Sequence, residues 1–99
     1  MNTLHPDLKN KIQQITILSM KVNNNDRQKL IDMIKHHSEE IEELYQNHND
    51  HWAIETADLI ILCFELLMVD RQNIDDIFTQ ALPRFDKKLN LLLQQRKMT

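Results

Sequence analysis

The amino-acid sequence predicts an all-α fold, an antiparallel bundle of four to five helices. Glycine is absent and proline occurs twice in 99 residues, which argues against tight β-hairpins and glycine-rich phosphate loops. Apolar residues recur at intervals of three and four, as on a helix face, and the alternation typical of strands is missing. Short asparagine- and aspartate-rich segments separate these stretches, and the length fits one domain spanning residues 1–99.

The first helix is expected over residues 6–22, because Pro6 suits the first turn of a helix, where its missing N–H costs nothing. It should end at the asparagines 23–25, since asparagine tolerates the left-handed conformation. Residues 1–25 therefore contain an N-terminal helix and an Asn-rich turn, and residues 26–97 contain the remaining, motif-bearing helices.

Asp26 is the predicted N-cap of the second helix. Its apolar face follows helical spacing along Leu30, Ile34, His37, Ile41, Leu44 and His48. We interpret His37 as a histidine in the core or at its boundary with one hydrogen bond, in preference to a metal ligand. The adjacent His36 is interpreted as a surface residue, although it lies one turn before Glu40 and could reach a metal. Residues 47–50 form the predicted turn, with Asn49 or Asp50 as the next cap.

The third helix, expected over residues 51–68, is apolar nearly all round from Leu59 onwards. Such a helix must be covered on every side, so we expect a second subunit to complete the bundle. Cys63 lies in this run and is interpreted as a buried small hydrophobe, too buried to act as a nucleophile.

The fourth helix is expected to begin after an Asn73 cap and to carry an apolar stripe as far as Leu93. Pro83 lies inside this pattern, where it removes one helical hydrogen bond, so a kink or break is expected near residues 81–82.

The charge, the cysteine count and the apolar runs of the sequence argue against several classes of binding partner. The formal net charge is −3 with both signs well mixed, which argues against nucleic acid as a partner. One cysteine excludes an internal disulfide, and residues 1–6 lack the pattern of a signal peptide. The longest apolar run, residues 59–69, is too short to span a bilayer and contains Glu65, so we expect a cytoplasmic protein without a membrane partner.

Two pairs of carboxylates suggest a metal site. Glu40 and Glu43, like Glu55 and Asp58, are three residues apart, which places their Cβ atoms about 5–6 Å apart on one helix face. Counted outward from the turn, Glu43 should lie at the height of Glu55, and Glu40 at the height of Asp58. Four facing carboxylates need a counter-charge, and Mg²⁺ suits them as a hard cation that is completed by substrate phosphates. The alternative is that each pair belongs to a solvated helix face.

The segment Glu39-Glu40-Ile41-Glu42-Glu43-Leu44 resembles the E-E-x-x-E-L motif of MazG-like nucleoside triphosphate pyrophosphohydrolases, members of the all-α NTP pyrophosphatase superfamily. Residues 55–60 resemble their E-x-x-D-L motif, and the resemblance covers roughly residues 28–89. It implies an all-α homodimer or homotetramer whose subunits together complete the active site. The implied activity is Mg²⁺-dependent hydrolysis of a (d)NTP to the monophosphate and pyrophosphate, serving nucleotide-pool sanitation, with Mn²⁺ as an alternative cation.

The resemblance also assigns residue roles. It implies that the metal ligands are Glu40, Glu43, Glu55 and Asp58. Glu39 would orient or deprotonate the attacking water, and basic residues of the last helix would meet the outer phosphates. The candidates for phosphate binding are Arg84, Lys87 and Lys88. Trp52 could stack a nucleotide base, or could close the end of the bundle.

The sequence departs from the family pattern at three places. Ala57 stands where a glycine is usual, Ile54 stands where another acid is frequent, and Arg84 to Lys88 only approximates the basic motif of the last helix. Two other functions therefore stay open. One is a non-catalytic helical dimerisation or adaptor module, and the other is a phosphoribosyl-ATP pyrophosphatase, whose fold and motifs are related.

Overall fold

The computed structural model describes residues 5–98, which form four α-helices and no strand, so the all-α prediction is confirmed. The helices are α1 (Pro6–Val22), α2 (Arg27–Gln46), α3 (Trp52–Val69) and α4 (Ile74–Met98). Residues 1–4, which contribute to the signal-peptide prediction, lie outside the described residues. Within residues 5–98, no helix has the length and apolar character needed to cross a membrane.

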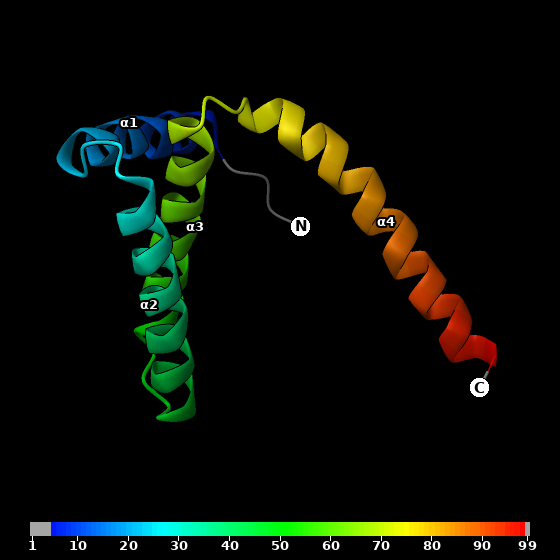
Figure 1. Ribbon diagram of the computed structural model, residues 1–99. Helices are drawn as coiled ribbons and strands as arrows, with labels where there is room; N and C mark the ends of the chain where they lie inside the picture. The colour runs from blue at the N-terminus through cyan, green and yellow to red at the C-terminus, as the bar shows by residue number, and fades with distance from the viewer. Residues whose placement is uncertain (1–4, 99) are drawn as a thin grey trace.

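The helices form an L-shaped cluster of three and one separate arm (Figure 1). α2 and α3 lie side by side and run in opposite directions, and α1 crosses the end of this pair where α2 begins and α3 ends. α4 starts at the same end and extends away from the other three helices, with no contact to α2. The chain by itself therefore contains an antiparallel helix pair, and α4 does not close a bundle around it.

Local signals explain most helix ends. The asparagines Asn24 and Asn25 adopt the left-handed conformation predicted for them, with φ of 53° and 55°. Asp26 caps α2 by accepting a hydrogen bond from the Lys29 N–H at 3.1 Å. Asn73 accepts one from the Asp76 N–H at 3.0 Å, as predicted for the start of α4.

The turn before α3 differs in detail from the prediction. His51, instead of Asn49 or Asp50, occupies the cap position, and its side chain makes no capping hydrogen bond. Asn49 accepts a hydrogen bond from the His51 N–H at 3.0 Å, and so stabilises the turn that precedes the cap position of α3. His48 lies exposed in this turn with a φ of 56°, outside the apolar face to which the sequence pattern assigned it.

The core is small and lies where α1, α2 and α3 meet. Leu30 is 0% exposed and packs in one cluster with Leu62 and Val69 of α3. Thr16 is buried on α1, where its hydroxyl donates to the Ile12 carbonyl at 2.7 Å. Because few side chains are fully buried, each of them carries a large part of the stability of this junction.

Glu65 is an acid inside this core, with 0% of its surface exposed. Its Oε2 accepts a hydrogen bond from Asn23 Nδ2 at 3.0 Å, which ties α3 to the turn after α1. Its Oε1 has no hydrogen-bond partner among the described residues. A buried carboxylate with one hydrogen bond is costly, so Glu65 connects the helices at a cost in stability.

We expect Glu65→Gln to raise the free energy of unfolding by about 1–2 kcal/mol, because a neutral amide costs less to bury and can still accept the bond from Asn23. Glu65→Ala should lower it by about 2 kcal/mol or more, since it leaves a cavity and an unpaired Asn23 amide. Urea unfolding followed by circular dichroism measures both variants. A Gln variant less stable than the wild type would contradict the expectation.

Pro83 does not break α4. The helix continues through it to Met98, and the ribbon curves gradually along its length (Figure 1). Of the two expectations, a kink or a break, the break is therefore wrong, and α4 curves instead without a sharp kink. An exposed helix tolerates the lost hydrogen bond because the Thr79 carbonyl that it frees can face water.

The predicted burial of Cys63 is also wrong for the single chain. Cys63 is exposed, and Ile60, one turn earlier on α3, is half exposed. α1 and α2 cover one side of α3, on which Leu62, Glu65 and Val69 are buried, and they leave the Cys63 side open. Partial burial of the thiol nevertheless raises the pKa of Cys63, so it remains a weak nucleophile near neutral pH.

This raised pKa predicts slow alkylation of Cys63. The thiolate is the reacting form, so at pH 8 the folded chain should react with iodoacetamide several-fold more slowly than the chain unfolded in urea. The two rates should converge as the pH rises through the raised pKa of the folded thiol. Mass spectrometry at timed intervals measures both rates. Equal rates at pH 8 would show that the folded thiol is not shielded.

Candidate functional site

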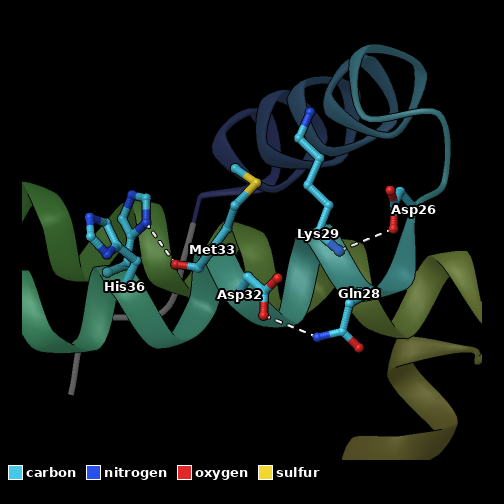
Figure 2. A pocket seen from close by; sticks show the side chains of 7 residues that line it. Asp26, Gln28, Lys29, Asp32, Met33 and His36 are labelled. Carbon is cyan, nitrogen blue, oxygen red and sulfur yellow. Dashed lines mark hydrogen bonds between the residues drawn. The ribbon is translucent and has the colours of Figure 1, made fainter.

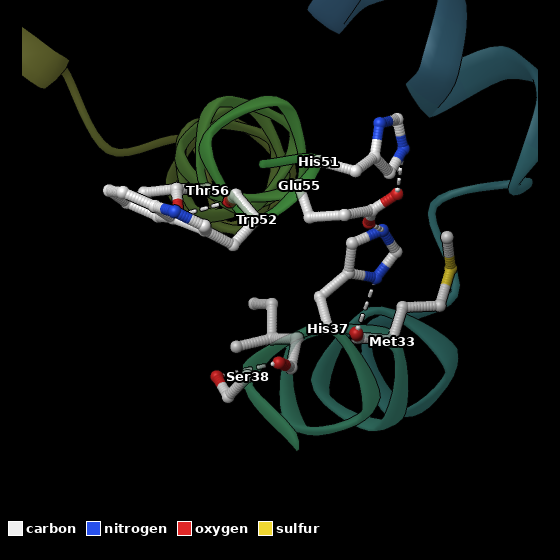
Figure 3. Close-up of polar contacts among 8 residues, drawn as sticks. Met33, His37, Ser38, His51, Trp52, Glu55 and Thr56 are labelled. Atoms are coloured by element: carbon white, nitrogen blue, oxygen red, sulfur yellow. Dashed lines mark hydrogen bonds and ion pairs between the residues drawn. The ribbon is translucent and has the colours of Figure 1, made fainter. Parts of the chain in front are cut away.

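Glu55 is the centre of the only group of described residues that could hold a metal ion. It lies in the first turn of α3, and its side chain is 14% exposed. Figure 3 shows two histidines beside it. His37 Nε2, from α2, lies 3.4 Å from Oε2, and His51 Nε2 lies 3.2 Å from Oε1. Each carboxylate oxygen of Glu55 therefore faces a different imidazole.

His37 is oriented by its own helix. Its Nδ1 lies 3.0 Å from the Met33 carbonyl oxygen, which can only accept, so Nδ1 carries the proton (Figure 3). The ring is thereby held with Nε2 pointing towards Glu55. His37 is half-buried and makes one hydrogen bond, to the Met33 carbonyl, as the sequence predicts, and the structure adds the facing carboxylate.

Asp58 joins this pair one turn further along α3. One carboxylate oxygen of Asp58, one of Glu55 and one ring nitrogen of His37 all lie within 4.8 Å of one another. Asp58 is exposed, whereas Glu55 and His37 are half-buried, so the group opens to solvent on the Asp58 side. The two carboxylates fit a divalent cation such as Mg²⁺, which needs one or two protein carboxylates and completes its shell with water or phosphate.

The other predicted carboxylates lie on α2 outside this group. Glu39, Glu40 and Glu43 are all exposed. The half-buried side chains of α2 include His37, Ile41 and Leu44, and the acids lie on the strip beside them. Glu40 follows His37 by three residues, so it projects from the same side of α2, one turn closer to the interhelical turn. The structure thus brings together Glu55 and Asp58, with His37 beside them in place of Glu40 and Glu43.

The predicted phosphate-binding residues lie on the separate arm. Arg84, Lys87 and Lys88 are exposed on α4, which extends away from α2 and α3 (Figure 1). Within one chain, these basic residues do not meet the carboxylate group.

Trp52, the predicted base-binding residue, packs against a second aromatic ring at the end of the α2–α3 pair. Its ring centroid lies 5.3 Å from that of Tyr45, and the planes are 77° apart in an edge-to-face contact. Trp52 is half-buried and Tyr45 is exposed, so this contact closes the end of the helix pair next to the turn.

A shallow hollow of about 550 Å³ lies along α2 between Asp26 and His36 (Figure 2), and His37 also lines it. Its polar rim is fixed locally, because Gln28 donates to Asp32 at 3.0 Å and Asp26 caps the helix. Lys29 also lines it. His37 lines this hollow and also belongs to the Glu55 group.

Sequence reasoning did not identify His37 and His51 as partners of Glu55. Counting from the turn placed Glu43 at the height of Glu55, but the side chain that reaches Glu55 is His37, six residues earlier. A signal was present, because His37 lies on the apolar stripe that faces α3, whereas Glu40 and Glu43 lie beside it.

No protein-family model matches the chain, and neither a curated protein nor a solved structure matches it. The chemistry of the site therefore rests on its own residues.

Proposed function

We propose that the protein is a metal-dependent nucleotide pyrophosphohydrolase, which cleaves a (d)NTP to the monophosphate and pyrophosphate in nucleotide-pool sanitation. The observation that carries the proposal is the meeting of Glu55 and Asp58 with His37 in one group open to solvent. These two acids form the E-x-x-D motif, and the E-E-x-x-E motif lies on the helix that runs beside them.

In this proposal, Glu55 and Asp58 hold Mg²⁺ or Mn²⁺. When bound, the cation polarises the phosphoryl oxygens and lowers the pKa of a bound water. Glu40 and Glu43 are exposed and long enough to change rotamer, so they contribute ligands once the substrate is present. Glu39 is exposed beside Glu40 and accepts a proton from the attacking water.

We further propose that a second copy of the chain completes the bundle as a homodimer or homotetramer. A compact monomer of 11.9 kDa exposes about 6,000 Å², whereas this chain exposes 8553 Å². Its radius of gyration is 16.4 Å, against about 13 Å for a compact domain of this length. The excess area is of the size that obligate interfaces bury on each partner.

Among the described helices, α4 carries the most exposed large apolar side chains. Residues spaced four and three apart form an apolar stripe along it, and all of them are exposed. They are Phe78, Leu82, Phe85, Leu89 and Leu92. A partner seated on this stripe brings the basic residues Arg84, Lys87 and Lys88 of α4 next to a second chain, where they can meet the outer phosphates.

A second candidate function is a non-catalytic dimerisation or adaptor module. The same α4 stripe favours it, because an exposed apolar helix binds partner helices whether or not the acids are catalytic. In that case the carboxylates of Glu40, Glu43, Glu55 and Asp58 are only solvated. A partner protein then remains bound after all four residues are replaced.

Pyrophosphate release from the common ribo- and deoxyribonucleoside triphosphates, with Mg²⁺ or Mn²⁺, tests the proposal. Phosphoribosyl-ATP belongs in the same panel, because it distinguishes the related pyrophosphatase. We expect release from at least one substrate and none from a chelated sample. If no substrate releases pyrophosphate, the hydrolase proposal is wrong and the adaptor function is favoured. If light scattering shows a monomer, the proposed homodimer or homotetramer is wrong.

A further inference from the structure

We propose that His37 is a metal ligand, and that His37, Glu55 and Asp58 form a site that prefers a first-row transition-metal ion to Mg²⁺. The inference rests on the same carboxylates as the proposed function and deepens it. It concerns metal binding alone, however, and does not require that any nucleotide is hydrolysed.

The spacing of the three donors suits one ion. Single ligand atoms of His37, Glu55 and Asp58 lie within 4.8 Å of one another. Zinc binds nitrogen and carboxylate oxygen at about 2.0–2.2 Å in a tetrahedral arrangement, so its ligand atoms lie about 3.3–3.6 Å from one another. A small side-chain movement is therefore enough to place all three around one ion. Both helices contribute, so the ion would also link α2 to α3.

The tautomer of His37 is the one that metal binding requires. Nδ1–H donates to the Met33 carbonyl at 3.0 Å, so a neutral ring carries its lone pair on Nε2. That atom lies 3.4 Å from Glu55 Oε2, so a neutral ring places two acceptors face to face, and either a bound metal ion or a proton on Nε2 satisfies them both. A backbone carbonyl on the far nitrogen is the usual arrangement behind a metal-binding histidine.

Glu55 is held in the same way. His51 Nε2 lies 3.2 Å from Oε1, which leaves Oε2 directed at His37. His51 itself does not belong to the three-donor group, so it acts as a support behind the ligand.

The donor set decides the preference among cations. Mg²⁺ takes oxygen ligands and keeps several waters, and imidazole is a poor substitute for either. Zn²⁺, Fe²⁺ and Ni²⁺ bind imidazole readily and accept carboxylates as further ligands. One nitrogen and two carboxylates therefore favour a transition metal, and Zn²⁺ is the probe of choice because it has no redox chemistry.

Isothermal titration of the full chain with Zn²⁺ and, separately, Mg²⁺ tests this without nucleotide. We expect wild type to bind Zn²⁺ at least about tenfold more tightly than Mg²⁺, and His37→Ala and His37→Gln to lower the Zn²⁺ affinity by about tenfold or more. Mg²⁺ affinity should change little. His36→Ala is the matched control, because His36 is the adjacent histidine, is exposed and lies outside the group.

Two results would overturn the inference. One is an equal loss of Zn²⁺ affinity in the His36 and His37 variants, which would mean that neighbouring histidines bind Zn²⁺ adventitiously. The other is wild-type Mg²⁺ binding as tight as Zn²⁺ binding. If the His37 variants unfold, ¹⁵N NMR spectra of the wild-type imidazoles test the inference instead. Zn²⁺ must then shift the Nε2 resonance of His37 and leave the ring resonances of His36 unchanged.

The outcome is separable from that of the proposed function. Pyrophosphate release with Mg²⁺ in a chain that does not bind Zn²⁺ through His37 rejects this inference alone. Zn²⁺ binding through His37 in a chain that hydrolyses no triphosphate supports this inference and rejects the proposed function.

Discussion

Glu55→Gln is expected to lower pyrophosphate release by about 100-fold or more. A bound cation supplies several kcal/mol of transition-state stabilisation, and each 1.4 kcal/mol is worth a factor of ten in rate. Glutamine keeps the size of the side chain but removes the negative charge that faces His37 and His51. Initial rates at saturating triphosphate and cation, with circular dichroism as a check on folding, measure the effect.

Glu42→Gln is the matched control for this variant. Glu42 carries the same charge on the neighbouring helix, but it is exposed and its contact is a weak 3.4 Å hydrogen bond from Gln46. Its replacement should leave the rate within about twofold, since solvent screens an exposed charge. Equal losses in the two variants would mean that overall charge, and not a metal ligand at Glu55, controls the rate.

Leu30→Ala should lower the free energy of unfolding by about 3–5 kcal/mol. Leu30 is 0% exposed and packs against α3 at the three-helix junction. Its truncation loses the transfer free energy of the side chain and leaves a cavity that rigid helices fill only in part. Because small domains have total stabilities near 5–15 kcal/mol, this variant should be close to unfolding at room temperature.

Ile31→Ala provides the comparison, because it removes an apolar side chain of the same volume from the next position on α2. Ile31 is 49% exposed, so its loss should cost less than about 1 kcal/mol. Urea unfolding at one fixed protein concentration keeps any contribution from subunit association constant. Similar losses in both variants would show that the junction at Leu30 is not the stabilising core.

The helices themselves could be predicted because their signals are local. Pro6 at the first turn, the asparagines at 24 and 25, and the caps at Asp26 and Asn73 act within four residues of the helix ends that they determine. Absence of glycine was equally informative about fold class, since it leaves few residues that suit tight hairpins.

Two of the three donors of the candidate site could also be predicted. Glu55 and Asp58 were chosen by their spacing, and a spacing of three on one helix brings two side chains together in any fold that keeps the helix. The pairing across helices could not be predicted in the same way. It depends on the rotation of α2 against α3, and packing of the apolar stripe turns His37, instead of Glu40 or Glu43, towards Glu55.

Local sequence set where the chain is helical, where α1, α2 and α3 end and which acids share a helix face, because these depend on neighbours along the chain. It did not predict that α4 continues through Pro83. Tertiary structure alone decided that Cys63 is uncovered, that α4 leaves the other helices, and that an imidazole faces Glu55. These features depend on which apolar faces find a partner, and the faces of one 99-residue chain are not all satisfied by its own helices.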